Sequence, residues 1–106
     1  MSTELRVVVT TFPDRECAEK VAQLMVDAGL AVCAQVGADL VSFYRLDGVV
    51  RRDPEVAVTF KVMQARFDLF AGEMLLQHPY EIPQIIAWPA EYVNRAYLDW
   101  AQGKKK

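Results

Sequence analysis

The sequence is poor in the side chains that usually bind soft metal ions. Among 106 residues it has one histidine, His78, and two cysteines, Cys17 and Cys33. The cysteines show no CxxC spacing, so no closed structural zinc site can be read from them. Two cysteines are also too few for a disulfide scaffold, and a cytoplasmic setting would keep them reduced. Each cysteine is therefore expected to pack as a small buried hydrophobe.

Long apolar runs are also missing. No stretch approaches the roughly 18 apolar residues that a membrane-spanning helix needs. The first residues hold no apolar region followed by a small-residue cleavage site, which is the pattern of a secretory signal. We therefore expect a cytoplasmic protein that has no membrane partner.

The composition is typical of one globular domain. Hydrophobic residues make up 53% of the chain and charged residues 25%, which suits a soluble protein with a substantial core. A length of 106 residues leaves no room for a second domain. We expect a single domain over 1–106, with an ordered core over about 4–102 and a disordered tail over 103–106.

The charge balance argues against nucleic acid as the principal partner. The formal net charge is −2, yet the tail Lys104–Lys106 supplies three of the 12 positive charges. Without that tail, nine positive charges face 14 negative ones, and the body of the chain carries −5. An acidic body without a basic face lacks the electrostatic footprint of a nucleic-acid-binding protein.

Hydrophobic periodicity predicts four strand-like and three helical segments. Asp14 is the expected N-cap of the first helix and Gly29 its C′ residue. Gly37 is the expected position of a β-bulge, and Asp47-Gly48 is a hairpin signal. In chain order the predicted elements are a strand over 5–12, a helix over 15–28, an extended segment over 30–46, a strand over about 55–63, a helix over 65–77, a strand over 84–88 and a helix from about Glu91.

The order of these elements, β-α-β-β-α-β with an appended helix, predicts a ferredoxin-like α+β sandwich. Right-handed crossovers place both main helices on one face of a four-stranded antiparallel sheet. The central hairpin, however, is far longer than the usual five or six residues per strand. Two helices of three to four turns cannot cover it.

The uncovered part of the hairpin is rich in apolar side chains. They are Val41, Phe43, Tyr44, Leu46, Val49 and Val50. An exposed apolar strand pair is a site for association with another chain. The sequence therefore predicts an oligomer.

The segment from His78 to Pro83 contains the single histidine, an aromatic side chain and a carboxylate between two prolines. Proline fixes φ and pushes the preceding residue toward extended conformations, so this segment must leave the second main helix as a stiff connection. A stiff connection can hold Tyr80, Glu81 and the imidazole in a fixed arrangement that suits binding. The alternative is a helix-to-strand crossover whose polar groups are simply solvated.

Several short motifs together resemble the CutA divalent-cation-tolerance protein family over nearly the whole chain. They are Pro13-Asp14, Leu30-Ala31-Val32-Cys33, Ser42-Phe43-Tyr44, Gly48, Glu55, Lys61, His78-Pro79-Tyr80-Glu81-Ile82-Pro83, Pro89 and Tyr97-Leu98-Asp99-Trp100. The resemblance implies a cytoplasmic homotrimer of ferredoxin-like subunits, interlocked through the long hairpins. It also implies a link to copper and other divalent cations and an architecture like that of the PII signalling proteins. No enzymatic activity is well established for the family.

The chain also departs from the family pattern. Arg45-Leu46 replace a tryptophan that usually follows Ser42-Phe43-Tyr44, and Val93 stands where relatives often have glycine. Some relatives carry a cysteine and a second histidine where this chain has Thr10 and Gln77. These replacements weaken the expectation that copper is bound by that cysteine and histidine.

One functional hypothesis is a metal site for copper or another divalent ion, with no obligatory cofactor. Soft and borderline ions prefer thiolate and imidazole ligands. A trimer could bring His78, Glu81 and Cys33 together from neighbouring subunits. The alternative is weak surface binding by the imidazole alone.

A second hypothesis is a ligand cleft between subunits, as in a PII-like sensor of a small anionic metabolite. Glu55 and Lys61 are expected on the sheet face opposite the helices, where a trimer would form clefts. Tyr80, His78 and Trp100 complete the expected surroundings. The alternative is that Glu55 and Lys61 form an interface ion pair, which would set register without adding stability.

Enzymatic activity is not expected. The chain has no Gly-rich phosphate loop, no GxSxG elbow and no HExxH helix. The leading interpretation is therefore a divalent-cation tolerance protein that binds without turnover, and the alternative is the PII-like sensor.

Overall fold

The computed structural model describes residues 4–103, so the tail predicted at Lys104–Lys106 lies outside the described part of the chain. Gly103, where the tail was expected to begin, donates its backbone N–H to the carbonyl of Trp100 over 2.9 Å. Within the described residues, no helix has the length and apolar character needed to cross a membrane.

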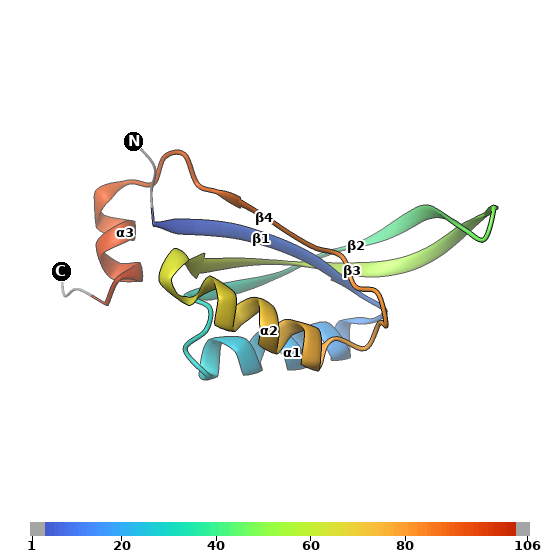
Figure 1. Ribbon diagram of the computed structural model, residues 1–106, viewed down its shortest axis with the longest axis horizontal. Helices are drawn as coiled ribbons and strands as arrows, with labels where there is room; N and C mark the ends of the chain where they lie inside the picture. The colour runs from blue at the N-terminus through green and yellow to red at the C-terminus, as the bar shows by residue number, and fades with distance from the viewer. Residues whose placement is uncertain (1–3, 104–106) are drawn as a thin grey trace.

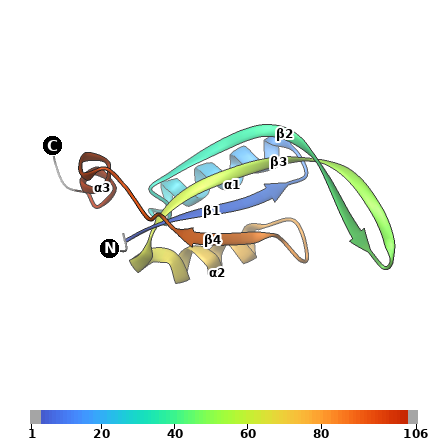
Figure 2. The same cartoon turned by 90° about the horizontal axis from the view of Figure 1, so that it is seen from above.

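The chain forms a four-stranded sheet with two helices side by side on one face, as Figures 1 and 2 show. In chain order the elements are β1 Leu5–Phe12, α1 Arg15–Asp27, β2 Cys33–Leu46, β3 Val49–Met63, a 3₁₀ turn Gln64–Arg66, α2 Phe67–Gln77, β4 Ile85–Pro89 and α3 Arg95–Ala101. Helix α3 lies at the end of the sheet opposite the tip of the β2–β3 hairpin (Figure 1).

The sheet order is β2-β3-β1-β4, and every neighbouring pair is antiparallel. Strand β1 therefore pairs with β3 on one side and with β4 on the other. This order, with α1 and α2 on one face, is the ferredoxin-like sandwich that the sequence predicts. The predicted fold class is confirmed.

Four predicted boundaries are wrong. Strand β2 begins at Cys33, since residues 30–32 form the connection from α1. Strand β3 begins at Val49, directly after the turn. The prediction began it near Glu55 because the polar residues between the turn and Glu55 obscure the strand pattern. Helix α2 begins at Phe67, since a 3₁₀ turn occupies Gln64–Arg66 first. Helix α3 begins at Arg95 because Asn94, at the N-cap position, has extended backbone angles of φ −63° and ψ 147°.

The core lies between the sheet and the two main helices. Strand β3 contributes every second residue to it, and these side chains are 5% exposed or less. They are Val56, Val58, Phe60 and Val62. The rings of Phe60 and Phe70, the latter from α2, meet edge to face with centroids 5.1 Å apart. The alternation predicted for β3 is therefore correct, and it leaves Glu55 and Lys61 on the open face of the sheet.

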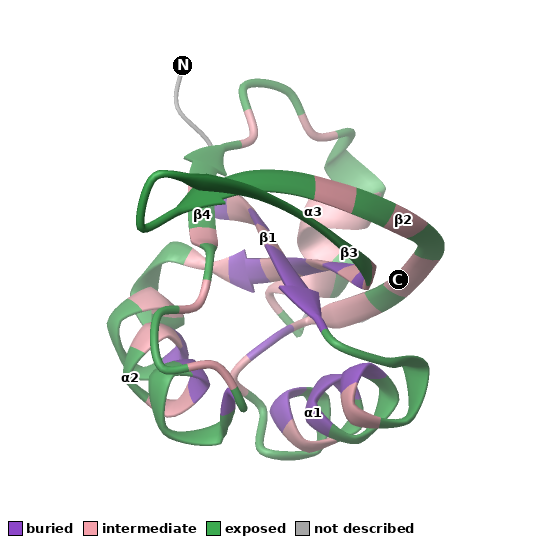
Figure 3. Ribbon diagram, turned by 90° about the vertical axis from the view of Figure 1, so that its right-hand side faces the viewer, coloured by how far each residue is buried: buried purple, intermediate pink, exposed green. Residues whose placement is uncertain are grey.

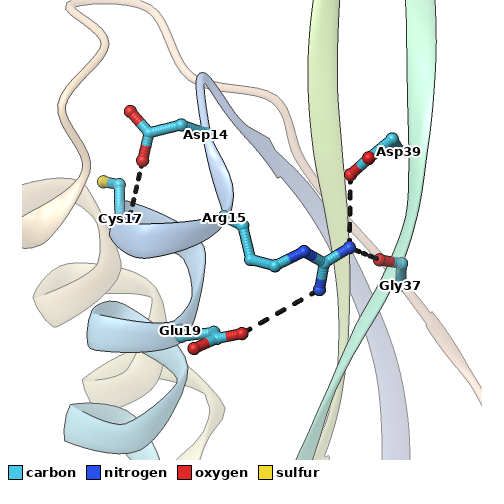
Figure 4. A network of polar contacts seen from close by, with 6 residues as sticks. All are labelled: Asp14, Arg15, Cys17, Glu19, Gly37 and Asp39. Atoms are coloured by element: carbon cyan, nitrogen blue, oxygen red, sulfur yellow. Dashed lines mark hydrogen bonds and ion pairs between the residues drawn. The ribbon is translucent and has the colours of Figure 1, made fainter.

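Helix α1 has the predicted caps. The Asp14 carboxylate accepts the N–H of Cys17 over 2.8 Å, which satisfies one of the free donors at the helix start (Figure 4). Gly29 follows the helix with φ +73°, a left-handed conformation that glycine adopts without strain.

A β-bulge bends β2 and is held by α1. The β2–β3 register shifts between Val36 and Asp39, at the glycine where the bulge was predicted. The Arg15 guanidinium donates to the Gly37 carbonyl over 3.0 Å and to the Asp39 carboxylate over 3.2 Å, as Figure 4 shows. A Cβ at Gly37 would lie 3.2 Å from the carbonyl oxygen of Ala57, so this close approach favours glycine.

Beyond the helices, the hairpin projects from the body and gives the chain dimensions of 50 × 28 × 24 Å. Asp47 and Gly48 have φ values of +52° and +78°, which fits the predicted two-residue turn. The residues of this projecting part are mostly exposed, as Figure 3 shows. The six apolar side chains predicted to be uncovered are between 42% and 68% exposed.

Replacing Gly72 with alanine is expected to stabilise the protein by about 0.5–1 kcal/mol, since glycine loses more backbone entropy in a helix. Gly72 is an exposed residue inside α2, and a Cβ there would meet nothing within 4 Å. Urea unfolding at equal protein concentration measures the change. Gly48→Ala is the contrast, because φ at Gly48 is +78° and a side chain there is strained. Equal effects of the two substitutions would contradict the prediction.

Candidate functional site

His78 lies directly after α2 and is buried, with 7% of its surface exposed. Its backbone has φ −71° and ψ 135°, the extended conformation imposed by the following proline. The ring fits against the end of β1, where its Nε2 lies 2.8 Å from the Thr11 carbonyl oxygen and 3.1 Å from Thr10 Oγ1. Its Nδ1 accepts the backbone N–H of Tyr80 over 3.1 Å.

These contacts determine which ring nitrogen of the neutral imidazole carries the proton. Because Nδ1 accepts a hydrogen bond, the proton of the neutral ring is on Nε2, which donates to the Thr11 carbonyl. The ring also stacks on Phe12, with centroids 4.5 Å apart and planes inclined by 15°. Both nitrogens are engaged within the chain, so His78 offers no free lone pair to a metal ion. It joins α2 to the end of β1.

Acid is expected to destabilise the protein through His78. Burial lowers the pKa of its imidazole below the ordinary 6.5, so between pH 7 and 5 the unfolded chain takes up a proton that the folded chain resists. The free energy of unfolding should therefore fall as pH drops below about 6.5, by at most about 1.4 kcal/mol per pH unit per chain. Urea unfolding at several pH values measures this slope. His78→Gln should flatten it; an equally steep slope in that variant would show that other groups cause it.

The predicted metal ligands do not meet within one chain. Glu81 is exposed on the connection after α2, while the Cys33 thiol lies at the start of β2, 3.3 Å from the Tyr97 hydroxyl. Burial and the contact with Cys33 raise the pKa of Tyr97 to about 12. Among residues 4–103, no three His, Cys, Asp or Glu side chains are grouped so that they could hold a metal ion.

Two of the predicted cleft residues do come together. The Tyr80 hydroxyl donates to Glu55 Oε2 over 2.7 Å, and the Ser42 hydroxyl donates to Glu55 Oε1 over 2.5 Å. Burial and the bond to Glu55 raise the pKa of Tyr80, so its phenol stays protonated. Glu55 thus joins β2, β3 and the connection after α2.

These residues line a groove of about 640 Å³ at the root of the hairpin. A second pair lies beside them: the Tyr44 hydroxyl donates to the Asp53 carboxylate, and this bond raises the pKa of the Tyr44 phenol. Asp53 and Tyr44 are not among the cleft residues predicted from the sequence. The hairpin register could have predicted them. Counted from the turn, it places Ser42 opposite Asp53, with both on the same face as Glu55.

Lys61 and Trp100 lie elsewhere. The Lys61 ammonium donates to Gln35, and its side chain lines a separate hollow of about 410 Å³ together with Asn94 and Tyr97. Trp100 lines a third hollow, of about 580 Å³. Within one chain, the predicted ligand cleft is therefore divided between Glu55 and Tyr80 at one end of the sheet and Lys61 at the other.

Comparison with known proteins places these features in a family. The sequence model described as "CutA1 divalent ion tolerance protein" matches residues 6–104. A divalent-cation tolerance protein CutA of Thermus thermophilus is 36% identical over 94 residues, which cover 89% of this chain and 91% of the relative.

Solved structures agree with the sequence match. The crystal structure of CutA1 from Shewanella sp. SIB1 has a TM-score of 0.92 and 31% identity, and the alignment covers 97% of this chain and 96% of that one. A structure titled as the periplasmic divalent cation tolerance protein CutA from Archaeoglobus fulgidus has a TM-score of 0.89 and 27% identity, covering 93% of this chain and 96% of that one. This chain belongs to the CutA1 divalent ion tolerance protein family.

Proposed function

We propose that this chain acts in divalent-cation tolerance as a homotrimer, without enzymatic turnover. The observation that supports assembly is the hairpin, because the strand register puts exposed apolar side chains on both of its faces. One face carries Tyr44, Leu46 and Val49, and the other carries Val41, Phe43 and Val50. Within residues 4–103, no element of a single copy covers either face, and such surfaces mark sites of association.

Light scattering coupled to size-exclusion chromatography tests the assembly. A homotrimer has a mass of about 36 kDa, three times the 12.0 kDa of the chain. The expected result at micromolar concentration is this value, independent of loading. A stable 12 kDa particle would remove the basis of the proposal.

We propose further that copper or another divalent ion is bound by side chains from different copies, with Glu81 and Cys33 as candidates. The support is that Glu81 is exposed and Cys33 half-buried, whereas His78 already uses both ring nitrogens. Calorimetric titration with Cu²⁺ should show weaker binding for Glu81→Gln and Cys33→Ser. Glu91→Gln is the matched control, since it removes one exposed carboxylate elsewhere. If His78→Gln alone abolishes binding, the assignment is wrong.

A PII-like sensor of a small anionic metabolite is the second candidate. One observation favours it: Lys61 lines a hollow with the polar side chains of Asn94 and Tyr97, a setting that suits an anion. Titration with small dicarboxylates and nucleotides is the test. Binding should be lost in Lys61→Ala and kept in Lys20→Ala, which removes an exposed lysine of α1. Equal losses in both variants would indicate nonspecific charge attraction.

The cytoplasm remains our proposed location for the protein. The support is that Cys17 and Cys33 are both free cysteines, as the reducing cytoplasm would keep them. The printed title of the Archaeoglobus fulgidus relative places that protein in the periplasm, so location varies among the relatives. Fractionation of cells that express the untagged chain tests the proposal, and recovery in the periplasmic fraction would contradict it.

A further inference from the structure

The groove at the root of the hairpin is lined by charged side chains of one sign, the negative. Among its lining residues the ionised side chains are the carboxylates of Asp53 and Glu55, and no lysine, arginine or histidine lines it. The donors to these carboxylates are neutral hydroxyl groups of Tyr44, Ser42 and Tyr80. The hydrogen bonds therefore orient both carboxylates without neutralising either.

Both carboxylates keep unused acceptor capacity. A carboxylate can accept about four hydrogen bonds. Glu55 accepts one on each oxygen, from Ser42 and from Tyr80, and Asp53 accepts one, from Tyr44. A further donor that carries positive charge could bind each of them with a charge-assisted hydrogen bond.

The cationic side chains of the hairpin lie beyond this lining. Arg52 pairs with Phe43 on the opposite face, where its guanidinium lies 5.9 Å from the ring centroid. Arg51 pairs with Tyr44 on the same face as Glu55, but it is exposed and is not part of the lining. Among the ion pairs of residues 4–103 none involves Asp53 or Glu55, so within one chain both carboxylates are open to a cationic partner.

The rest of the lining suits an apolar body. Tyr44 and Tyr80 contribute aromatic rings, and Pro13, Pro54 and Ile82 contribute aliphatic surface. Aromatic rings attract cations through their negative faces, and they also shield the apolar part of a ligand from water. The hydroxyl protons of Tyr44 and Tyr80 already bind carboxylates, so neither phenol is available to donate to an anion.

We propose that this groove binds a small organic ammonium ion with an apolar body, its charged nitrogen at Asp53 and Glu55. This inference goes beyond divalent-cation tolerance and does not depend on the metal proposal. It also differs from the anionic ligand considered at Lys61, since the two hollows have opposite charge. The groove, at about 640 Å³, has room for such a ligand.

Three probes of nearly equal shape and different charge test the proposal on the intact protein at neutral pH and low salt. They are benzylamine as its ammonium ion, neutral benzyl alcohol and anionic benzoate. Isothermal titration calorimetry should show benzylamine binding about tenfold or more tightly than benzyl alcohol, with benzoate weaker still. Added salt should weaken benzylamine binding only.

Charge-neutralising variants identify the residues. Glu55→Gln and Asp53→Asn should each weaken benzylamine binding about tenfold, while Glu91→Gln, an exposed carboxylate outside the groove, should leave it within twofold. Asp53 is exposed, so its variant is informative even if Glu55→Gln disturbs folding. Circular dichroism and the solution mass of each variant separate a lost site from a lost fold.

Three results would each overturn the proposal. The first is equal binding of benzylamine and benzyl alcohol, and the second is equal effects of Glu55→Gln and Glu91→Gln. The third is no benzylamine binding to the wild type; a lower solution mass for Asp53→Asn would then show that a basic side chain of a neighbouring copy fills the groove. Each of these results leaves the homotrimer proposal standing, because that proposal is judged by the wild-type mass.

Discussion

The double substitution Phe43→Glu and Val49→Glu is expected to convert the proposed homotrimer into single 12.0 kDa chains. The two residues are 68% and 60% exposed in one copy and lie on opposite faces of the hairpin, so one charge is introduced on each apolar face. Burying an unpaired carboxylate in an interface costs several kcal/mol. In a homotrimer this cost recurs at each interface between copies, so complete dissociation is the expected outcome. Light scattering measures it.

Leu76→Glu is the matched control for this experiment. Leu76 is 79% exposed, more than either hairpin residue, but it lies on α2 and far from the hairpin tip. Its substitution should leave the solution mass unchanged. If Leu76→Glu dissociates the assembly and the hairpin variant does not, the contact surface lies on the helices, and the hairpin is an exposed arm with another use.

The fold could be predicted because each of its elements carries its own local signal. The valines of β1, the cap at Asp14, the Asp47-Gly48 turn and the glycine of the bulge all act through residues adjacent in sequence. Register then follows from the turn, since a two-residue hairpin loop fixes the pairing of both strands. Even the exposed apolar hairpin followed from a comparison of strand and helix lengths.

The candidate site could be predicted only in part, because its contacts join distant segments. His78 was expected to face a cleft, yet the ring turns toward Thr11, 67 residues earlier in the chain. A sequence shows that an imidazole lies in a stiff segment, but it does not show which backbone carbonyl will accept its hydrogen bond. Tyr80 and Glu55 meet within one chain, whereas Lys61 lies elsewhere, since six residues along β3 move it about 20 Å from Glu55.

His78→Ala is expected to cost about 2–4 kcal/mol of stability per chain. The substitution removes a buried ring that stacks on Phe12, and it leaves a cavity between α2 and β1. It also leaves the Thr11 carbonyl and the Tyr80 N–H without the partner that they have in the wild type. Urea unfolding at fixed protein concentration measures the loss, since the stability of an oligomer depends on concentration.

Gln77→Ala, at the adjacent position, is the control. Together the two variants distinguish a structural role of His78 from a metal-binding role. Gln77 is exposed, and its amide donates to Glu73 over 2.7 Å on the surface of α2, so its loss should change stability by less than about 0.5 kcal/mol. Cu²⁺ titration of both variants completes the test. If the imidazole is structural, His78→Ala lowers stability while its folded fraction still binds Cu²⁺ as the wild type does. An unchanged unfolding midpoint together with lost Cu²⁺ binding would instead make His78 a metal ligand, and its bonds to Thr11 and Tyr80 would then have to be replaceable at little cost.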